Sequence, residues 1–395
     1  MVLLRFLPLL VTLGLLQGCG TMDAISDSVS SYMGGEDNSA PPAPLTEFQP
    51  LVEIGTVWSA SIGEGTDEQF LRLAPAVAGE RVFAADHEGL VTARALATGQ
   101  TIWEQELDLP VSGGPGLGEG LVLLGSSDGD LVALSQEDGR QQWRVAVPSE
   151  VLSAPQASDG VVVVRTADSR VSAYRAANGE RIWTYVREVP DLTLRGSSAP
   201  VIAGGRVIAG FDNGRLAALD LHSGRLLWEA LIGVPRGRTE LERMVDIDAT
   251  PRVVEDTVYI ASYHASVAAV DLESGRIRWS REISTDADLG VDEDNVYVAA
   301  EDGSVWALDR ITGSSVWRQE RLQNRRLSGP VPFGDLVAVG DGYGYLHWLR
   351  RDDGQFAART ALDETPILTP PLVAGDLLLV YTSGGHLTAL RPIAP

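Results

Sequence analysis

Short apolar runs of four or five residues, each bounded by turn residues, recur along most of the chain. In one stretch, strand-like runs at 207–211, 216–220 and 226–229 are separated by turns at Asp212-Asn213-Gly214 and His222-Ser223-Gly224. Runs of this length between Gly-, Asn- and Asp-containing turns are typical of strands joined by hairpins. No stretch of useful length repeats apolar residues at the i, i+3, i+4 spacing of an amphipathic helix. The pattern predicts an all-β chain.

The runs belong to a unit that occurs eight times with fixed internal spacing. Pro200 is followed by Gly214 after 14 residues, by Gly224 after 10 more, and by Trp228 after 4 more. The same proline position is occupied by Pro75, Pro115, Pro155, Pro251, Leu289, Pro330 and Pro371 in the other copies. The tryptophan position is occupied by Trp58, Trp103, Trp143, Trp183, Trp279 and Trp317, and by Ala358 in the copy that begins at Pro330. Four short strands per repeat of about 40 residues predict an eight-bladed β-propeller.

The two ends of the chain are expected to complete one blade together. The last copy reaches Arg391 with too few residues left for a fourth strand, whereas Glu53–Trp58 has the strand-plus-tryptophan pattern with no unit before it. We expect residues 53–60 to supply that fourth strand and to close the ring. Closure removes the open sheet edges that favour aggregation. The propeller is predicted to span residues 47–395.

The N-terminal segment resembles the leader of a bacterial lipoprotein. Arg5 precedes an apolar run at 7–16, which is followed by Leu16-Gln17-Gly18-Cys19, a tetrapeptide similar to the lipobox. The resemblance implies that residues 1–18 are a signal peptide and that Cys19, the only cysteine, is lipid-modified (diacylglyceryl and a further acyl chain such as palmitate). Several acyl chains make a stable anchor. Gly20 after the cysteine implies the outer membrane. Residues 19–46, rich in Ser, Asp, Gly and Pro, are predicted to be a flexible tether.

Composition narrows the possible partners. With 31 basic and 54 acidic residues the net charge is −23, and nucleic-acid phosphates would be repelled. The five histidines do not have metal-ligand spacing. No P-loop, dinucleotide or nucleophile-elbow motif occurs. We therefore predict no catalytic residue, no metal and no cofactor.

The segment Ala307–Gly313, together with Trp317 four residues later, resembles the tryptophan-docking repeat of pyrroloquinoline-quinone (PQQ) propellers. That resemblance implies that each tryptophan stacks on a turn of the next blade and is structural. It also raises the alternative of a PQQ-dependent dehydrogenase-like protein. The lack of a second cysteine, which such enzymes commonly pair over the cofactor, and the placement of most acidic residues in turns argue against that alternative.

From the lipobox to Arg391, the whole chain resembles the BamB family of outer-membrane protein assembly factors. The most specific local matches are 52–58 and 191–196. The resemblance implies a non-enzymatic scaffold lipoprotein of the Bam complex, held at the periplasmic face of the outer membrane. It would bind the POTRA domains of the insertase BamA and assist the insertion of outer-membrane proteins; direct contact with nascent clients stays open. A periplasmic surface-binding propeller is a further alternative, although the long connections offer only Phe70 and Tyr185 as aromatic contacts.

Length variation falls entirely between one tryptophan and the next proline. The interval is 12 residues before blades two and three and 13 before blades seven and eight, but 17 from Trp58 to Pro75, 17 from Trp183 to Pro200 and 23 from Trp228 to Pro251. Extra loop length on a rigid scaffold often carries function. By family resemblance, the positions associated with BamA contact are Leu192, Leu194, Arg195, Asp246 and Asp248. Two alternatives remain: the leucines could fold back onto the propeller, and the aspartates could pair with Arg195 or Arg243.

Overall fold

The computed structural model describes residues 40–66, 69, 71–187, 198–235, 238–239 and 243–393. The chain divides into two compact units, Met1–Pro41 and Pro42–Pro395, and the account below concerns the second. In the described part of this unit all regular elements are strands. They form eight four-stranded sheets, which confirms the predicted eight-bladed propeller.

In blades one to seven the four strands follow one another in chain order as an antiparallel meander. Blade one contains β2 (Ala76–Ala78), β3 (Arg81–Ala85), β4 (Leu90–Ala95) and β5 (Thr101–Glu106). Blade two contains β6 (Val111–Gly118), β7 (Leu121–Ser126), β8 (Asp130–Ser135) and β9 (Gln141–Ala146). Blade three contains β10 (Gln156–Ser158), β11 (Val161–Thr166), β12 (Arg170–Arg175) and β13 (Arg181–Val186). Blade four contains β14 (Val201–Ala203), β15 (Arg206–Gly210), β16 (Arg215–Asp220) and β17 (Leu226–Leu231).

The second half of the propeller repeats this plan. Blade five contains β18 (Arg252–Val254), β19 (Thr257–Ala261), β20 (Val267–Asp271) and β21 (Ile277–Arg281). Blade six contains β22 (Gly290–Val291), β23 (Asn295–Ala299), β24 (Val305–Asp309) and β25 (Ser315–Gln319). Blade seven contains β26 (Val331–Phe333), β27 (Leu336–Gly340), β28 (Tyr345–Arg350) and β29 (Phe356–Ala361). Blade eight contains β30 (Leu372–Ala374), β31 (Leu377–Tyr381), β32 (His386–Ile393) and β1 (Glu53–Ser61).

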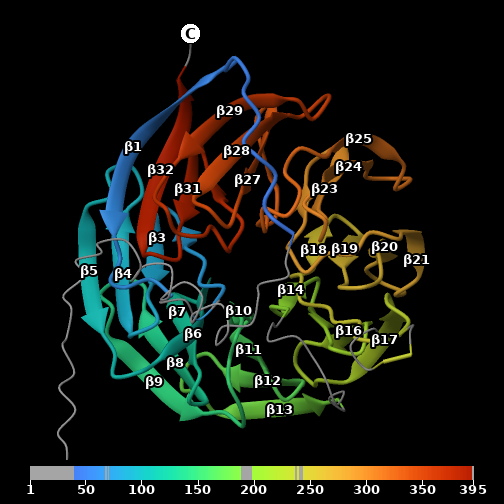
Figure 1. The fold of residues 1–395 in the computed structure, drawn as a ribbon. Coiled ribbons are helices and arrows are strands. Elements are labelled where there is room, and N and C mark those ends of the chain that lie inside the picture. Colours follow the sequence, from blue (N-terminus) through green and yellow to red (C-terminus); the bar gives the residue numbers. More distant parts are fainter. Residues whose placement is uncertain are drawn as a thin grey trace, which may run out of the picture. The chain divides into compact units, whose positions relative to one another are not determined.

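Blade eight is closed by the N-terminal strand, as predicted. β1 pairs with β32 in antiparallel register from Glu53 opposite Ile393 to Ser61 opposite His386. Figure 1 shows the blue β1 beside the red β32. The body of the propeller begins slightly before the predicted boundary at 47, because the backbone of Ala43 donates to Gln323 O and Arg359 donates to Thr46 O. Blade seven therefore holds the segment that leads into β1.

Each of the seven tryptophans docks on the next blade, as the PQQ-like repeat implied. Trp228, for example, donates from Nε1 to the carbonyl oxygen of Leu272 at 2.9 Å. A Cβ added to Gly275 would lie 2.6 Å from the Trp228 ring. Only a glycine therefore lets the turn lie flat on the indole. Equivalent Nε1–carbonyl bonds of 2.7–3.1 Å are made by Trp58, Trp103, Trp143, Trp183, Trp279 and Trp317.

Trp58 gives this docking a second role in closure. Its strand completes blade eight, while its indole donates to Leu96 O of blade one at 2.8 Å. The N-terminal strand thus joins the last blade through a backbone ladder and the first blade through a buried aromatic ring. Large aromatic rings bury on the order of 150–250 Å² each. Closure therefore stabilises both neighbouring blades.

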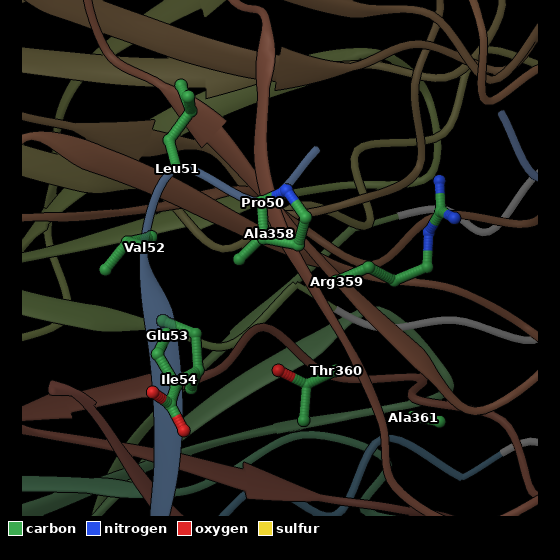
Figure 2. A pocket seen from close by; sticks show the side chains of 9 residues that line it. All are labelled: Pro50, Leu51, Val52, Glu53, Ile54, Ala358, Arg359, Thr360 and Ala361. Atoms are coloured by element: carbon green, nitrogen blue, oxygen red, sulfur yellow. The ribbon is translucent and has the colours of Figure 1, made fainter. Parts of the chain in front are cut away.

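The junction of blades seven and eight departs from the pattern because no third-to-fourth-strand turn exists in blade eight. Residues 50–54 approach β29 in its place, and Leu51 N donates to Ala357 O at 2.8 Å. Residues 50–54 and 358–361 line the resulting hollow of about 500 Å³, and Figure 2 shows their side chains. A docked indole would find no turn carbonyl here, which explains why Ala358 occupies the tryptophan position.

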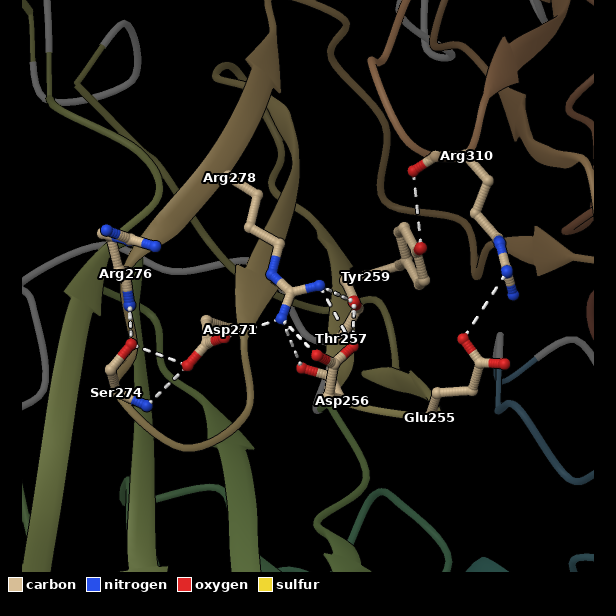
Figure 3. Close-up of polar contacts among 9 residues, drawn as sticks. All are labelled: Glu255, Asp256, Thr257, Tyr259, Asp271, Ser274, Arg276, Arg278 and Arg310. Carbon is tan, nitrogen blue, oxygen red and sulfur yellow. Dashed lines mark hydrogen bonds and ion pairs between the residues drawn. The ribbon is translucent and has the colours of Figure 1, made fainter.

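The first-to-second and third-to-fourth strand turns lie at the end of the propeller opposite the long connections. In blade five, Arg278 binds Asp256 at 2.7 Å and Asp271 at 2.6 Å, as Figure 3 shows. The hydrogen bond from Arg278 holds the pKa of Asp271 well below its usual range. Arg310 of blade six reaches Glu255 at 3.6 Å. Ion pairs thus fasten the turns of this end to one another, within and between blades.

Candidate partner-binding face and central cavity

The candidate face is formed by the second-to-third strand turns and the blade-to-blade connections, which emerge at the same end of the propeller because strands alternate in direction. Three of the five predicted contact residues, Leu192, Leu194 and Arg195, lie outside the described residues, as does Cys19. Their roles remain predictions. Asp246 and Asp248 are described, and their surroundings define what this face can do.

The last residues of the connection from blade four to blade five pack on a turn of blade four. Val245 forms a parallel bridge with Asn213, and Ile247 N donates to Phe211 O at 3.3 Å. Asp246 is 1% exposed, and its backbone oxygen accepts from Tyr263 N at 2.8 Å. The connection is therefore clamped between the turns of blades four and five, which positions Asp246 and Asp248.

Asp248 is a buried carboxyl with little direct compensation. It is 3% exposed, and its Oδ1 has no hydrogen-bond partner among the described residues. Burial raises its pKa to about 7, the charge of Arg72 opposes the rise, and Asp246 adds to it. A carboxyl with this pKa exchanges its proton near neutral pH. Asp248 can thus respond to a charge brought close to it.

Asp248 lines a cavity of about 500 Å³ on the propeller axis. The residue directly before the repeat's proline position contributes to the lining in seven of the eight blades: Ala74, Ala154, Ala199, Thr250, Asp288, Gly329 and Pro370. Equivalent repeat positions from so many blades can meet only at the axis of a closed ring. These equivalent positions therefore place the cavity at the mouth of the central channel.

The charge of the cavity is predominantly acidic. Asp286, Asp288 and Glu301 lie in its lining beside Asp248, and Arg72 and Arg326 are the basic lining residues. Arg72 is already engaged, because it donates to Asp286 Oδ2 at 2.7 Å and to Asp286 O at 2.8 Å. This pair joins the connection before blade one to the connection before blade six. It also places a guanidinium near Asp248 without hydrogen-bonding to it.

The Arg72–Asp286 pair was not predicted from the sequence, although one signal existed. The connection from Trp58 to Pro75 is as long as that before blade four, and Arg72 lies within it. The length of this connection is unusual, but no sequence pattern links Arg72 to a partner 214 residues away. The ion pair follows from ring closure, which brings blade one and blade six to the same axis.

A buried ion pair supports the face between blades three and four. Arg165 donates to Asp212 Oδ1 at 2.5 Å, and Ser169 Oγ donates to Asp212 Oδ2 at 2.7 Å. From the sequence, Asp212 is predicted only as a turn residue. The structure adds an inter-blade role and explains Ser169, which stands where six of the other seven copies have glycine and has φ of 57°.

Metal-ligating groups do not gather in the described residues: no set of three or more His, Cys, Asp or Glu side chains could hold an ion there. The histidines have structural surroundings instead. His347 is fully buried beside Asp341, with its Nε2 2.9 Å from Asp341 Oδ2. His87 is also buried, and its Nδ1 lies 3.1 Å from Gly65 O. Among the described residues no helix has the length and apolar character needed to cross a bilayer.

Comparison with known proteins decides the family. The profile of the family described as "Outer membrane protein assembly factor BamB" matches residues 87–319 and 316–392. The chain belongs to the BamB family. The BamB of Xanthomonas campestris is 42% identical over 391 residues, covering 95% of this chain and 94% of that protein. The BamB of Pseudomonas aeruginosa is 41% identical, covering 93% and 96%.

Solved structures agree with this family. The crystal structure of BamB from Moraxella catarrhalis superposes with a TM-score of 0.79 at 27% identity, covering 86% of this chain and 100% of that one. Quinohemoprotein alcohol dehydrogenase from Comamonas testosteroni has a TM-score of 0.67 at 14% identity over 86% of this chain and 76% of its own. The dehydrogenase likeness shows the propeller fold alone. The family is one of assembly factors and not of PQQ dehydrogenases.

Proposed function

We propose that the protein is a non-enzymatic scaffold of the outer-membrane β-barrel assembly machinery. It binds the periplasmic POTRA domains of BamA and assists the insertion of outer-membrane proteins. The observation that carries this proposal is identity of 41–42% to BamB proteins over more than nine-tenths of both chains. A lipid on Cys19 anchors the propeller to the periplasmic face of the outer membrane through a tether that ends near residue 42.

The proposed contact surface is the face of the long connections. Leu192, Leu194 and Arg195 supply the apolar and basic contacts of the connection before blade four. Asp246 and Asp248 act from the connection before blade five. Because both carboxylates are buried, a partner reaches Asp248 through the central cavity, whereas Asp246 positions the connection.

Co-purification from solubilised outer membrane tests the proposal. Replacement of Leu192 and Leu194 by alanine together, or Arg195→Glu alone, should reduce recovery of BamA while the propeller stays folded. Arg278→Ala, at the opposite end of the propeller, is the matched control and should leave recovery unchanged. Undiminished recovery of BamA with both face variants at normal expression would contradict the assignment of the face. Cys19→Ser should release the protein from the membrane fraction.

A further inference from the structure

The central cavity holds a polar group that the propeller itself does not satisfy. Asp248 Oδ1 is buried and accepts no hydrogen bond from the described residues. A buried carboxylate without a donor costs free energy. The other acidic lining residues differ, since Glu301 accepts from Ser284 Oγ at 2.8 Å and Asp288 accepts from Thr250 N at 2.6 Å. Among the acidic lining residues, Asp248 is therefore the one whose carboxylate has an oxygen without a donor; the hydroxyl of Thr369, in the same lining, also lacks a partner among the described residues.

We propose that the central cavity receives one basic side chain, a lysine ammonium or an arginine guanidinium, from the polypeptide bound on the face of the long connections. That side chain donates to the Asp248 carboxylate. The inference rests on the proposed function and specifies the chemistry of the partner at the same face. Asp248 is in this sense a specificity-determining residue.

The lining of the cavity favours a cation over other occupants. An anion would meet Asp248, Asp286, Asp288 and Glu301. The described residues contain no group of ligands suited to a metal ion. An apolar side chain would leave the carboxylate buried and unpaired, which is costly. A single ammonium or guanidinium supplies both the missing donor and the missing charge.

The volume and position of the cavity fit a side chain of a larger partner. About 500 Å³ lies within the range of small-ligand sites and admits one extended basic side chain with accompanying water. Arg72 is held by Asp286 through two hydrogen bonds. The cavity opens among the connections that the partner is proposed to cover, so the side chain would lie near the centre of the interface, where desolvated contacts contribute most.

Proton release measures this contact directly. The pKa of Asp248 is raised to about 7, so the isolated protein holds a proton there below neutral pH, and a bound cation displaces it. Calorimetric titration of the full lipidated chain with purified BamA POTRA domains, in two buffers of different ionisation enthalpy, should show net proton release that increases as the pH is lowered from 8 to 6. The dissociation constant should rise up to about tenfold per pH unit below pH 7.

Asp248→Asn keeps the shape of the side chain and removes its charge. This variant should bind at least about tenfold more weakly, release fewer protons on binding, and lose the pH dependence. Glu301→Gln is the matched control, because its carboxylate lines the same cavity but is already hydrogen-bonded; it should release protons like the unmodified chain. The basic partner residue is the one whose alanine substitution causes no further loss in the Asp248→Asn background.

The outcomes separate the two proposals. POTRA binding with proton release unchanged by Asp248→Asn overturns the cavity contact and leaves the scaffold function intact. The same holds if no basic POTRA residue is coupled to Asp248. Absence of any POTRA binding by the unmodified chain overturns the proposed partner, and the cavity inference with it.

Discussion

Trp348 lies directly opposite Ala358 in the β28–β29 ladder, an inversion of the pairs found in the other seven blades. There the third strand supplies the alanine and the fourth strand the tryptophan, as with Ala218 opposite Trp228. The inverted indole points into the blade interior, where Trp348 is fully buried and its Nε1 donates to Thr360 Oγ1 at 3.2 Å. The total side-chain volume of the pair is therefore the same as in the other blades, but the indole is on the third strand, because blade eight has no turn on which a fourth-strand indole could dock.

Exchanging the two residues back should therefore fail to restore stability. Trp348→Ala should cost about 3–5 kcal/mol through the cavity it leaves. Adding Ala358→Trp should recover little of this, because the junction of blades seven and eight lacks the turn carbonyl that accepts the other indoles. Urea denaturation of the two variants measures the difference. If the double variant regained most of the lost stability, the missing turn would not be the reason for the inversion.

The docking of tryptophan on glycine can be separated from backbone strain within a single blade. Gly224 and Gly205 have φ of 68° and 71°. A Cβ at Gly224 would lie 2.5 Å from the Trp183 ring, whereas a Cβ at Gly205 would meet no atom within 4 Å. Both alanine variants should lose about 1–2 kcal/mol to the left-handed conformation. Gly224→Ala should lose about 1–3 kcal/mol more, because the added methyl displaces the indole.

Thermal denaturation of the two glycine variants provides the test, with Gly205→Ala as the control for strain. Equal losses of stability would mean that the indole moves freely and that docking does not constrain the turn. A larger loss in Gly224→Ala alone would assign the difference to the Trp183 contact.

The sequence predicted the fold well because the repeat encodes it. The spacing from Pro200 to Trp228 defines strands and turns that every blade shares, and closure followed from the unmatched strand at Glu53. The candidate site was predicted only in part. The cavity depends on contacts such as Arg72 with Asp286, which join connections without common register, and the inward placement of Trp348 depends on a junction that occurs once. Local periodicity carries no information about either.

Acid should weaken blade seven through His347. Burial lowers the pKa of His347; Arg359 Nε donates to its Nδ1 at 3.3 Å, while Asp341 and Arg325 lie on the other side of the ring. The folded state therefore favours neutral imidazole, whereas an unfolded histidine has a pKa of about 6.5. Stability from this residue is complete above that value and is lost as pH falls below it.

The loss attributable to His347 should grow as the pH falls from 7.5 to 5.5, because the unfolded chain binds a proton more readily than the folded chain. Urea denaturation at pH 7.5 and 5.5 should show that His347→Gln is less sensitive to this change than the unmodified chain. Comparing the two proteins cancels the contributions of other titrating groups. The same sensitivity in both would indicate that His347 is protonated in the folded state.

Asp248 should affect stability in the opposite direction from binding. Its pKa is raised from 3.8 to about 7, so the folded state retains a proton that the unfolded state releases between these values. Folding is therefore favoured at acidic pH, and this contribution is lost as pH rises towards 7. Since one pKa unit corresponds to about 1.4 kcal/mol, the ionised carboxylate destabilises the free protein by up to about 4 kcal/mol.

Asp248→Asn should stabilise the isolated propeller at pH 8 and leave its stability nearly unchanged at pH 4. Denaturation curves at the two pH values measure this, with Glu301→Gln as control. A fold stabilised by the same substitution that weakens POTRA binding would show that the carboxylate is retained for the partner, whereas a variant less stable at pH 8 would mean that Asp248 holds the propeller together.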